Sequence, residues 1–414
     1  MFRLKTGRLI PMLYDNFFEE ELGVLKTEGR YRVFADLERH VSNSPTATWH
    51  SPDGPKLVVV WCSNDYLGMS HHPSVIRAAI EAGRAYGAGS GGTRNISGTN
   101  HLHVELERTI ANLHEKEAGL VFSSGYVANE ATLCTLTKGL PNCVAFCDEK
   151  IHASMIQGIS HSRVPKHIFS HNNLDQLRQQ LSQYDKKQPK LIAFVSVYSM
   201  EGDFAPIEVI CDLAKEYNAL TYLDEVHAVG IYGKGGAGRA NELNQQHRID
   251  VIQGNFAKAY GVIGGYITGS KSLVDYVRSF ASGFIFTTSL PPMVTSAATA
   301  SIKALQEADD LREKLWDNVK LLKSLLSKTQ VNYSNTPSHI VPVVIGNARI
   351  CKDFTDALLH DFGIYVQPIN YPTVPKGEER MRLTVTPFHT KEMIHHMVDA
   401  LNTLWGSFFM KMAG

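Results

Sequence analysis

Short apolar, β-branched segments alternate with amphipathic helical stretches along most of this 414-residue chain, and this alternation constrains the fold most. One helix is predicted at 73–86, where a proline suits the first helical turn, and another at 102–113 from its apolar periodicity. The apolar segments lie at 57–62, 119–122, 144–147, 167–169, 191–197, 220–223, 251–252 and 266–268. Strands that are apolar on both faces and separated by helices predict a mostly parallel sheet covered by helices.

The pattern changes after Pro291 and Pro292. Apolar spacing predicts a long amphipathic helix at 311–326, and only two strands follow it, at 339–345 and 381–385. At this length two or three domains are expected. We therefore predict an N-terminal segment at 1–59, a large α/β domain at 60–295 and a smaller α+β domain at 296–414.

The composition argues against several classes of protein. The 41 basic residues balance the 41 acidic ones, so the chain lacks the basic surplus of a nucleic-acid-binding protein. No apolar run reaches the roughly 18 residues of a membrane span. The six scattered cysteines have no zinc-binding spacing, so we expect no metal site. We expect the cysteines to be reduced thiols, which fits a protein of the cytoplasm. Residues 1–16 lack the features of a secretory leader, which also favours a cytoplasmic location.

A glycine-rich segment at 87–92 matches the G-x-G-x-x-G pattern literally. A dinucleotide-binding loop would follow a strand and open a helix, whereas this segment follows a predicted helix and continues into a polar loop at 93–98. We interpret it instead as a loop that approaches a ligand through its backbone, with Thr93 and Asn95 as polar contacts.

A carboxylate, an imidazole and an amine stand at positions that together fit one cofactor. Asp224 ends an apolar strand, where parallel sheets place ligands, and His227 follows it. These two alone also fit a metal site, a catalytic dyad, or a strand cap beside a surface histidine. Lys258 lies in a glycine-flanked turn, and a desolvated lysine can form Schiff bases. The three together indicate pyridoxal phosphate (PLP), which needs such a lysine and an acid at its ring nitrogen.

Two further segments are compatible with PLP. Residues 123–126 lie between an apolar strand and a helix, so their backbone N–H groups can hold a phosphate. His152 follows the strand at 144–147 and could stack on a flat ring, although a histidine at a helix start is more often structural.

Nine segments carry a resemblance to a known family, at 31–39, 61–69, 87–99, 121–129, 196–203, 222–230, 257–261, 283–292 and 363–384. Through them the chain resembles the α-oxoamine synthases, which are fold-type I PLP enzymes with a mostly parallel sheet in a large domain and a smaller α+β domain. The glycine loop contains the sequence TRNISGT, and in this it resembles one branch of the family. The enzymes of that branch condense glycine with succinyl-CoA to 5-aminolevulinate, a haem precursor. The resemblance therefore implies an acyltransferase that works as a homodimer with shared active sites.

The resemblance also implies roles for individual residues. Lys258 would form the Schiff base, Asp224 would pair with the ring nitrogen, His227 would contact the ring hydroxyl and His152 would stack on the ring. These four are the expected catalytic residues. The other expected PLP-binding residues are Ser124, Gly125, Tyr126, Ser199 and Asn255, with Thr287 and Thr288 reaching the phosphate of the partner subunit.

The implied substrate-binding residues form two groups. Arg382 would bind the glycine carboxylate, with Asn64 close by. The acyl-CoA residues would be Arg32, Thr93 and Asn95 for the terminal carboxylate, Lys166 for the CoA phosphates, and Thr373.

The chain departs from the family pattern at a few positions. Asn255 replaces a threonine near the phosphate, Ile151 replaces an asparagine before the stacking histidine, and Cys147 replaces a serine near CoA. These changes leave open the affinity for cofactor and CoA, and the pathway that the product feeds. Two alternatives are a sister synthase that uses another acyl-CoA or amino acid, and a non-catalytic PLP-fold protein. The intact Lys258 and Asp224 count against the second.

Overall fold

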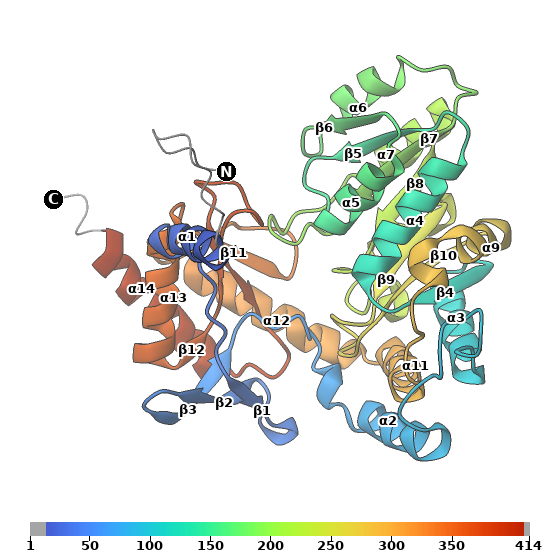
Figure 1. Ribbon diagram of the computed structural model, residues 1–414. Coiled ribbons are helices and arrows are strands. Elements are labelled where there is room, and N and C mark those ends of the chain that lie inside the picture. Colours follow the sequence, from blue (N-terminus) through green and yellow to red (C-terminus); the bar gives the residue numbers. More distant parts are fainter. Residues whose placement is uncertain (1–13, 410–414) are drawn as a thin grey trace, which may run out of the picture.

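A seven-stranded sheet forms the centre of the larger lobe in the computed structural model, which describes residues 14–409 (Figure 1). Its strands run in the order β4 (Ala118–Phe122), β10 (Gly265–Gly269), β9 (Val251–Asn255), β8 (Leu220–Asp224), β7 (Lys190–Val195), β5 (Val144–Asp148), β6 (Lys166–Phe169). Strands from β9 to β6 pair in parallel, and β10 is antiparallel to both its neighbours. The predicted mostly parallel sheet is confirmed.

The sheet is buried on both faces, which explains why its strands are apolar throughout. Every residue of β5, β7, β9 and β10 is buried. The covering helices and their neighbours are α2 (Pro73–Tyr86), α3 (His101–Leu113), α4 (Gly125–Gly139), α5 (Ala153–Ser162), α6 (Leu174–Leu181), α7 (Ile207–Tyr217), α8 (Arg239–Glu242), α9 (Lys271–Phe280), α10 (Ser282–Ile285) and α11 (Pro292–Gln306). Helix α4 packs on α5 and crosses β9 and β10, so its N-terminus lies at the strand ends that build the site.

The first apolar strand belongs to a different sheet from the one its place in the alternation suggested. The strand expected at 57–62 is β3 (Gly54–Val60), which forms a hairpin with β2 (Thr46–Ser51). The four-stranded sheet has the order β1 (Leu37–Arg39), β2, β3, β12 (Ile364–Tyr365). A strand so close in sequence to its partner pairs with it locally as a hairpin. The N-terminal segment is thus joined to the C-terminal lobe through β12.

The smaller lobe contains the helix and both strands expected after residue 296. Strands β11 (Ile340–Val344) and β14 (Arg380–Thr384) pair antiparallel, and β13 (Pro368–Ile369) completes this sheet. The surrounding helices are α12 (Asp309–Leu326), α13 (Ala348–Phe362) and α14 (Lys391–Phe409). Helix α11 instead packs on α2 and α3. The division of the chain at residues 60 and 296 stays a prediction.

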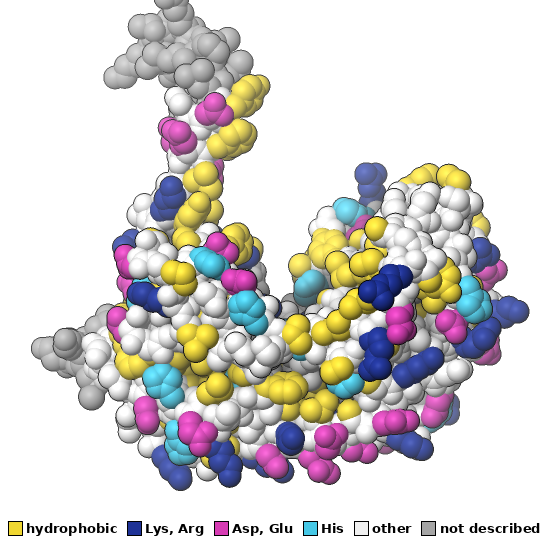
Figure 2. Space-filling model, turned by 90° about the horizontal axis from the view of Figure 1, so that it is seen from below, with side chains coloured by type: hydrophobic (Ala, Val, Ile, Leu, Met, Phe, Trp, Pro, Cys, Tyr) yellow, Lys and Arg dark blue, Asp and Glu magenta, His cyan; other side chains and the backbone are white. Residues whose placement is uncertain are grey.

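Helix α1 (Tyr14–Thr27) extends from the body and carries exposed hydrophobic side chains, among them Phe17 and Phe18 (Figure 2). In the described part of the chain, the helices are all too short or too polar to span a membrane. The expectation that no leader precedes the fold concerns mainly residues 1–13, which lie outside the described residues.

Candidate active site

The carboxyl ends of the parallel strands bring the central group of predicted residues together. Asp224 is the last residue of β8 and Asn255 the last of β9, while α4 begins at Gly125 after β4. Ligands of parallel sheets bind at this edge, because the loops that follow the strands leave a crevice there.

The Asp224 side chain is buried and accepts hydrogen bonds that fix its position. Its side-chain oxygens accept hydrogen bonds from Asn129 Nδ2 at 2.9 Å and from the Val226 backbone N–H at 3.0 Å. Asn129 is in turn fixed by Tyr222, whose hydroxyl donates to Asn129 Oδ1 at 2.8 Å. Because two lone-pair positions remain on a carboxylate that accepts two hydrogen bonds, Asp224 keeps capacity for one further cationic donor.

Lys258 is half-buried in the same environment. Burial lowers the pKa of its amine to about 8, the nearby Asp224 opposes that change and the Arg382 guanidinium adds to it. A lysine with a lowered pKa has a larger neutral fraction near pH 7 and is a better nucleophile towards a carbonyl.

His227 is neutral in this environment. Burial lowers its pKa well below the ordinary value, and the Lys258 and Arg382 charges lower it further. Its Nδ1 lies 2.8 Å from the hydroxyl of Tyr66, a fully buried residue. The ring therefore has a fixed orientation and Nε2 is left to face another group.

His152 caps the N-terminus of α5. Its Nδ1 accepts a hydrogen bond from the Ser154 backbone N–H at 3.2 Å and lies 2.7 Å from the Ser154 hydroxyl. Burial lowers its pKa, which Asp224 partly offsets. A structural role for His152 as a helix cap is thus compatible with stacking on a cofactor ring. The cap fixes the imidazole, and Asp224 and Lys258 lie near enough to affect the charge of His152.

The N-terminus of α4 is a candidate phosphate site. Ser124 is the N-cap, and its hydroxyl accepts from the Val127 N–H at 3.2 Å. Strand β10 approaches closely, since a Cβ on Gly265 would collide with the backbone of Ser124 and Gly125. Asn255 lies against Gly125, and its buried Oδ1 has no partner in the described structure. The helix start, with its N–H groups and positive dipole, suits an anion.

Arg382 approaches this centre from β14 of the smaller lobe. It donates from Nη2 to Asn64 Oδ1 at 2.6 Å and from Nη1 to the Ser199 carbonyl at 3.5 Å. Its buried Nε has no partner among residues 14–409. A guanidinium with a donor to spare can bind a carboxylate.

The predicted acyl-CoA residues form separate groups in the chain. Arg32 Nη2 lies 3.3 Å from Thr373 Oγ1. Thr93 instead pairs with Thr288 in an isolated β-bridge, so the glycine loop, which also holds Asn95, lies beside the segment with Thr287. Lys166 is at the start of the edge strand β6 and donates to Ser160 Oγ at 2.8 Å. Within the described residues no hydrogen bond links Arg32 to the glycine loop.

Sequence reasoning missed the residues that support the site from behind. Tyr66 orients His227, and Asn129 and Tyr222 hold Asp224. Tyr66 lies in a segment that carried the family resemblance, but a buried aromatic side chain in an apolar stretch gives no separate sign of a polar contact.

The groups present fit PLP. A lysine of lowered pKa lies near enough to the buried Asp224 carboxylate to be affected by its charge, and the start of α4 offers N–H groups to a phosphate, with the Asn255 side-chain amide close to Gly125 there. The fold and this group define a fold-type I PLP-dependent transferase. The sequence of residues 56–401 matches the family of class I and II aminotransferases. A serine palmitoyltransferase of S. paucimobilis with bound PLP–myriocin aldimine has a TM-score of 0.88 at 28% identity, covering 96% of this chain and 99% of that one.

Curated sequences narrow the class further. The chain is 55% identical to the 5-aminolevulinate synthase of Rhizobium meliloti over 95% of its length and 98% of the relative's. It is 53% identical to that of Paracoccus denitrificans, over 95% and 97%. The chain belongs to the 5-aminolevulinate synthase family, and it is a PLP-dependent acyltransferase.

Proposed function

We propose that this chain condenses glycine with succinyl-CoA to give 5-aminolevulinate, CoA and CO2. The observation that carries the proposal is one site in which the Lys258 amine is near enough to the Asp224 carboxylate and the Arg382 guanidinium for both to affect its pKa, and in which a buried N–H of Arg382 has no partner among residues 14–409. The first two suit PLP, and the third suits the carboxylate of an amino acid.

Particular residues would hold the cofactor. Lys258 would bind it covalently, Asp224 would pair with its ring nitrogen, and His227 and His152 would contact the ring. The phosphate would be bound by Ser124, Gly125, Tyr126 and Asn255, with Ser199 nearby and Thr287 and Thr288 from the partner subunit. This assignment is supported by the position of these groups at the strand ends and at the start of α4.

The reaction divides among the same residues. When bound, PLP supplies an electron sink for negative charge at the α-carbon of the amino acid. Lys258 acts as the base that takes the α-proton of glycine, and Asp224 holds a proton at the ring nitrogen. Arg382 orients the glycine carboxylate until that group leaves as CO2. The four-carbon succinyl group is transferred to the α-carbon, and CoA leaves as a thiolate that takes a proton from solvent. Once CO2 has left, Lys258 returns the proton that it holds to the α-carbon.

The acyl-CoA would be bound by residues from two subunits of a homodimer. Arg32 and Thr373 would contact the terminal carboxylate of the succinyl group, and Lys166 the CoA phosphates. Thr93 and Asn95 would reach this carboxylate from the partner, because Thr93 pairs with Thr288, which we assign to the partner's site. The six free cysteines are compatible with the reduced cytoplasm, where we place the protein.

An isotope experiment tests this function. The purified chain is loaded with PLP and given succinyl-CoA and glycine labelled with carbon-13 at its carboxyl carbon. The proposal predicts 5-aminolevulinate without the label and labelled CO2, both detected by mass spectrometry. Label retained in a condensed product, or no CoA-dependent product from glycine, would contradict the proposal.

A further inference from the structure

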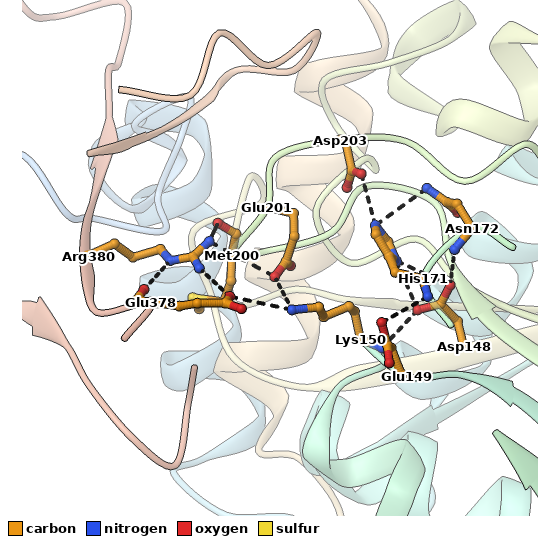
Figure 3. A network of polar contacts seen from close by, with 10 residues as sticks. All are labelled: Asp148, Glu149, Lys150, His171, Asn172, Met200, Glu201, Asp203, Glu378 and Arg380. Carbon is orange, nitrogen blue, oxygen red and sulfur yellow. Dashed lines mark hydrogen bonds and ion pairs between the residues drawn. The ribbon is translucent and has the colours of Figure 1, made fainter. Parts of the chain in front are cut away.

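Four charged side chains of alternating sign form a closed ring where the two lobes meet (Figure 3). Lys150 Nζ lies 3.3 Å from Glu201 Oε1 and 3.6 Å from Glu378 Oε2. Arg380 contacts the same two carboxylates, at 2.8 Å from Glu378 Oε2 and 4.0 Å from Glu201 Oε1. Lys150 and Glu201 follow strands of the larger lobe. Arg380 is the first residue of β14 in the smaller lobe, and Glu378 lies two residues before it.

The ring is partly shielded from water. The Arg380 side chain is 7% exposed and those of Glu201 and Lys150 are 19% and 22% exposed, whereas Glu378 is 45% exposed. Arg380 also donates to the Met200 carbonyl at 3.0 Å and to the Glu378 carbonyl at 2.8 Å. Charges that are partly buried and shared among several partners are screened less than isolated surface pairs.

Each half of the ring is two residues away from a residue of the candidate active site. Lys150 precedes His152, and Glu201 follows Ser199, whose carbonyl accepts from Arg382. Arg380 precedes Arg382 in β14, and side chains two apart in a strand lie on the same face. A shift of Arg380 away from the larger lobe would therefore shift Arg382 away from Lys258.

The larger-lobe half of the ring has its own support. The Lys150 backbone N–H donates to Asp148 Oδ1 at 2.8 Å. His171 lies between Asp148 and Asp203, with nitrogen–oxygen distances of 3.0 and 2.8 Å (Figure 3). The turns that carry Lys150 and Glu201 are thus joined to each other through His171, and the ring has a fixed base on this lobe.

We propose that Lys150, Glu201, Glu378 and Arg380 are positioning residues that hold β14 against the larger lobe and so set the place of Arg382. They act through Arg382 on the binding of the amino-acid carboxylate. The kinetic consequence rests on the proposed function, whereas the mechanical link between the lobes does not.

The kinetic test compares Lys150→Gln with wild type and with Lys150→Arg. We expect Lys150→Gln to raise KM for glycine about 3- to 10-fold and to leave kcat within about two-fold, because it weakens binding and leaves the reacting groups in place. Raising the salt concentration should raise KM more in wild type than in Lys150→Gln. Lys150→Arg should restore most of the wild-type KM. An unchanged KM, or a loss in kcat alone, would overturn the positioning role.

A matched control removes a charge of similar exposure far from the lobe junction. Arg248 is paired with Asp212 at 2.5 Å and its side chain is 24% exposed. Arg248→Gln should leave the KM for glycine at the wild-type value. A rise equal to that of Lys150→Gln would show a general effect of charge removal and overturn the assignment.

Backbone hydrogen exchange tests whether the ring holds the two lobes together, and it does so in the absence of catalysis. We expect the PLP-loaded Lys150→Gln enzyme, without substrates, to exchange backbone hydrogens of residues 378–384 faster than wild type, with β8 unchanged. Equal exchange in the two proteins would overturn the ring as a link between the lobes. If wild type formed no 5-aminolevulinate but Lys150→Gln still exchanged faster, the proposed function would fail while the link survived.

Discussion

Burial determines the protonation states of the central residues. Lys258 loses part of its preference for the charged form, with a pKa lowered to about 8, and His227 becomes neutral. The Asp224 side chain accepts hydrogen bonds from Asn129 and from the Val226 backbone N–H. An amine with a lowered pKa can act as the base that proton transfer at an α-carbon needs.

Replacing Lys258 with alanine removes the only side chain to which we assign covalent attachment of PLP. We expect turnover to fall by about 100-fold or more while the fold survives, because a general base contributes on that order. Intact-mass spectrometry after borohydride reduction should find the PLP adduct in wild type and not in the variant. Circular dichroism checks the fold. A variant that retains the adduct, or that turns over at the wild-type rate, would refute the assignment.

Arg32 is the residue to which we assign the choice of acyl group. We expect Arg32→Leu to lower kcat/KM for succinyl-CoA about 10- to 100-fold more than for butyryl-CoA, since a charge-assisted hydrogen bond contributes roughly 1.5–3 kcal/mol. Butyryl-CoA is the matched control, with the same chain length and no carboxylate. Equal losses on both thioesters would make Arg32 an ordinary surface residue.

At the scale of single residues, the sequence predicted the reacting side chains better than the side chains that hold them in place. Asp224 and Lys258 stand out because a strand-end acid and a lysine in a glycine-flanked turn are uncommon together. Tyr66 and Asn129 could not be found in the same way, because their roles depend on partners 161 and 95 positions away in the chain.

At the scale of the elements, the residues of the candidate active site lie at the ends of strands and at the start of a helix. The strands β8 and β9 finish at Asp224 and Asn255, and the close approach of β10 at Gly265 sets the start of α4 beside them. The turns after β5 and β7 are joined through His171, which lies between two carboxylates.

The histidine that joins these two turns should make stability depend on pH. Burial opposes its charge, yet hydrogen bonds to Asp148 and Asp203 raise the pKa of His171 to about 10. This stabilisation is fully present below pH about 6.5, the pKa of an unfolded histidine, and is lost as pH rises towards 10. Urea unfolding at several pH values should show a larger loss of stability between pH 6.5 and 10 in wild type than in His171→Asn. Parallel curves would contradict this account.

Element prediction succeeded where apolar periodicity was strong and failed where pairing was the question. The long helix at 311–326 is present as α12, and both strands of the smaller lobe are present. The strand near residue 57 exists, but its sheet was misjudged. Alternation in sequence reveals that a strand exists, and it does not reveal which neighbour completes its hydrogen bonds.

At the scale of the whole molecule, two groups of acyl-binding candidates have separate partners, and no hydrogen bond links Arg32 to the glycine loop within residues 14–409. Arg32 lies with Thr373, and Thr93 lies with Thr288. A two-fold dimer can bring the first set of one subunit to the second set of the other. In the proposed homodimer, the sequence predicts these acyl-binding residues but does not indicate which subunit each of them serves.

Mixing subunits tests this sharing of sites. Lys258→Ala and Thr288→Ala proteins, each with little activity, are dissociated together and reassembled. A random mixture should recover activity at about a quarter of the sites, because half the dimers are hybrids and each hybrid has one intact site. Activity no higher than the average of the two proteins, or a protein that sediments as a monomer, would contradict shared sites.

Substrate choice is the most direct measure of the central claim. The enzyme is given glycine and, in separate reactions, succinyl-, butyryl-, acetyl- or palmitoyl-CoA, and the rate of CoA release is measured. Serine and alanine replace glycine in a second series. The account predicts the highest kcat/KM for glycine with succinyl-CoA, and 5-aminolevulinate as the product. A preference for another acyl group or amino acid would make the chain a sister synthase, and no glycine-dependent CoA release with any thioester would contradict catalysis of this kind.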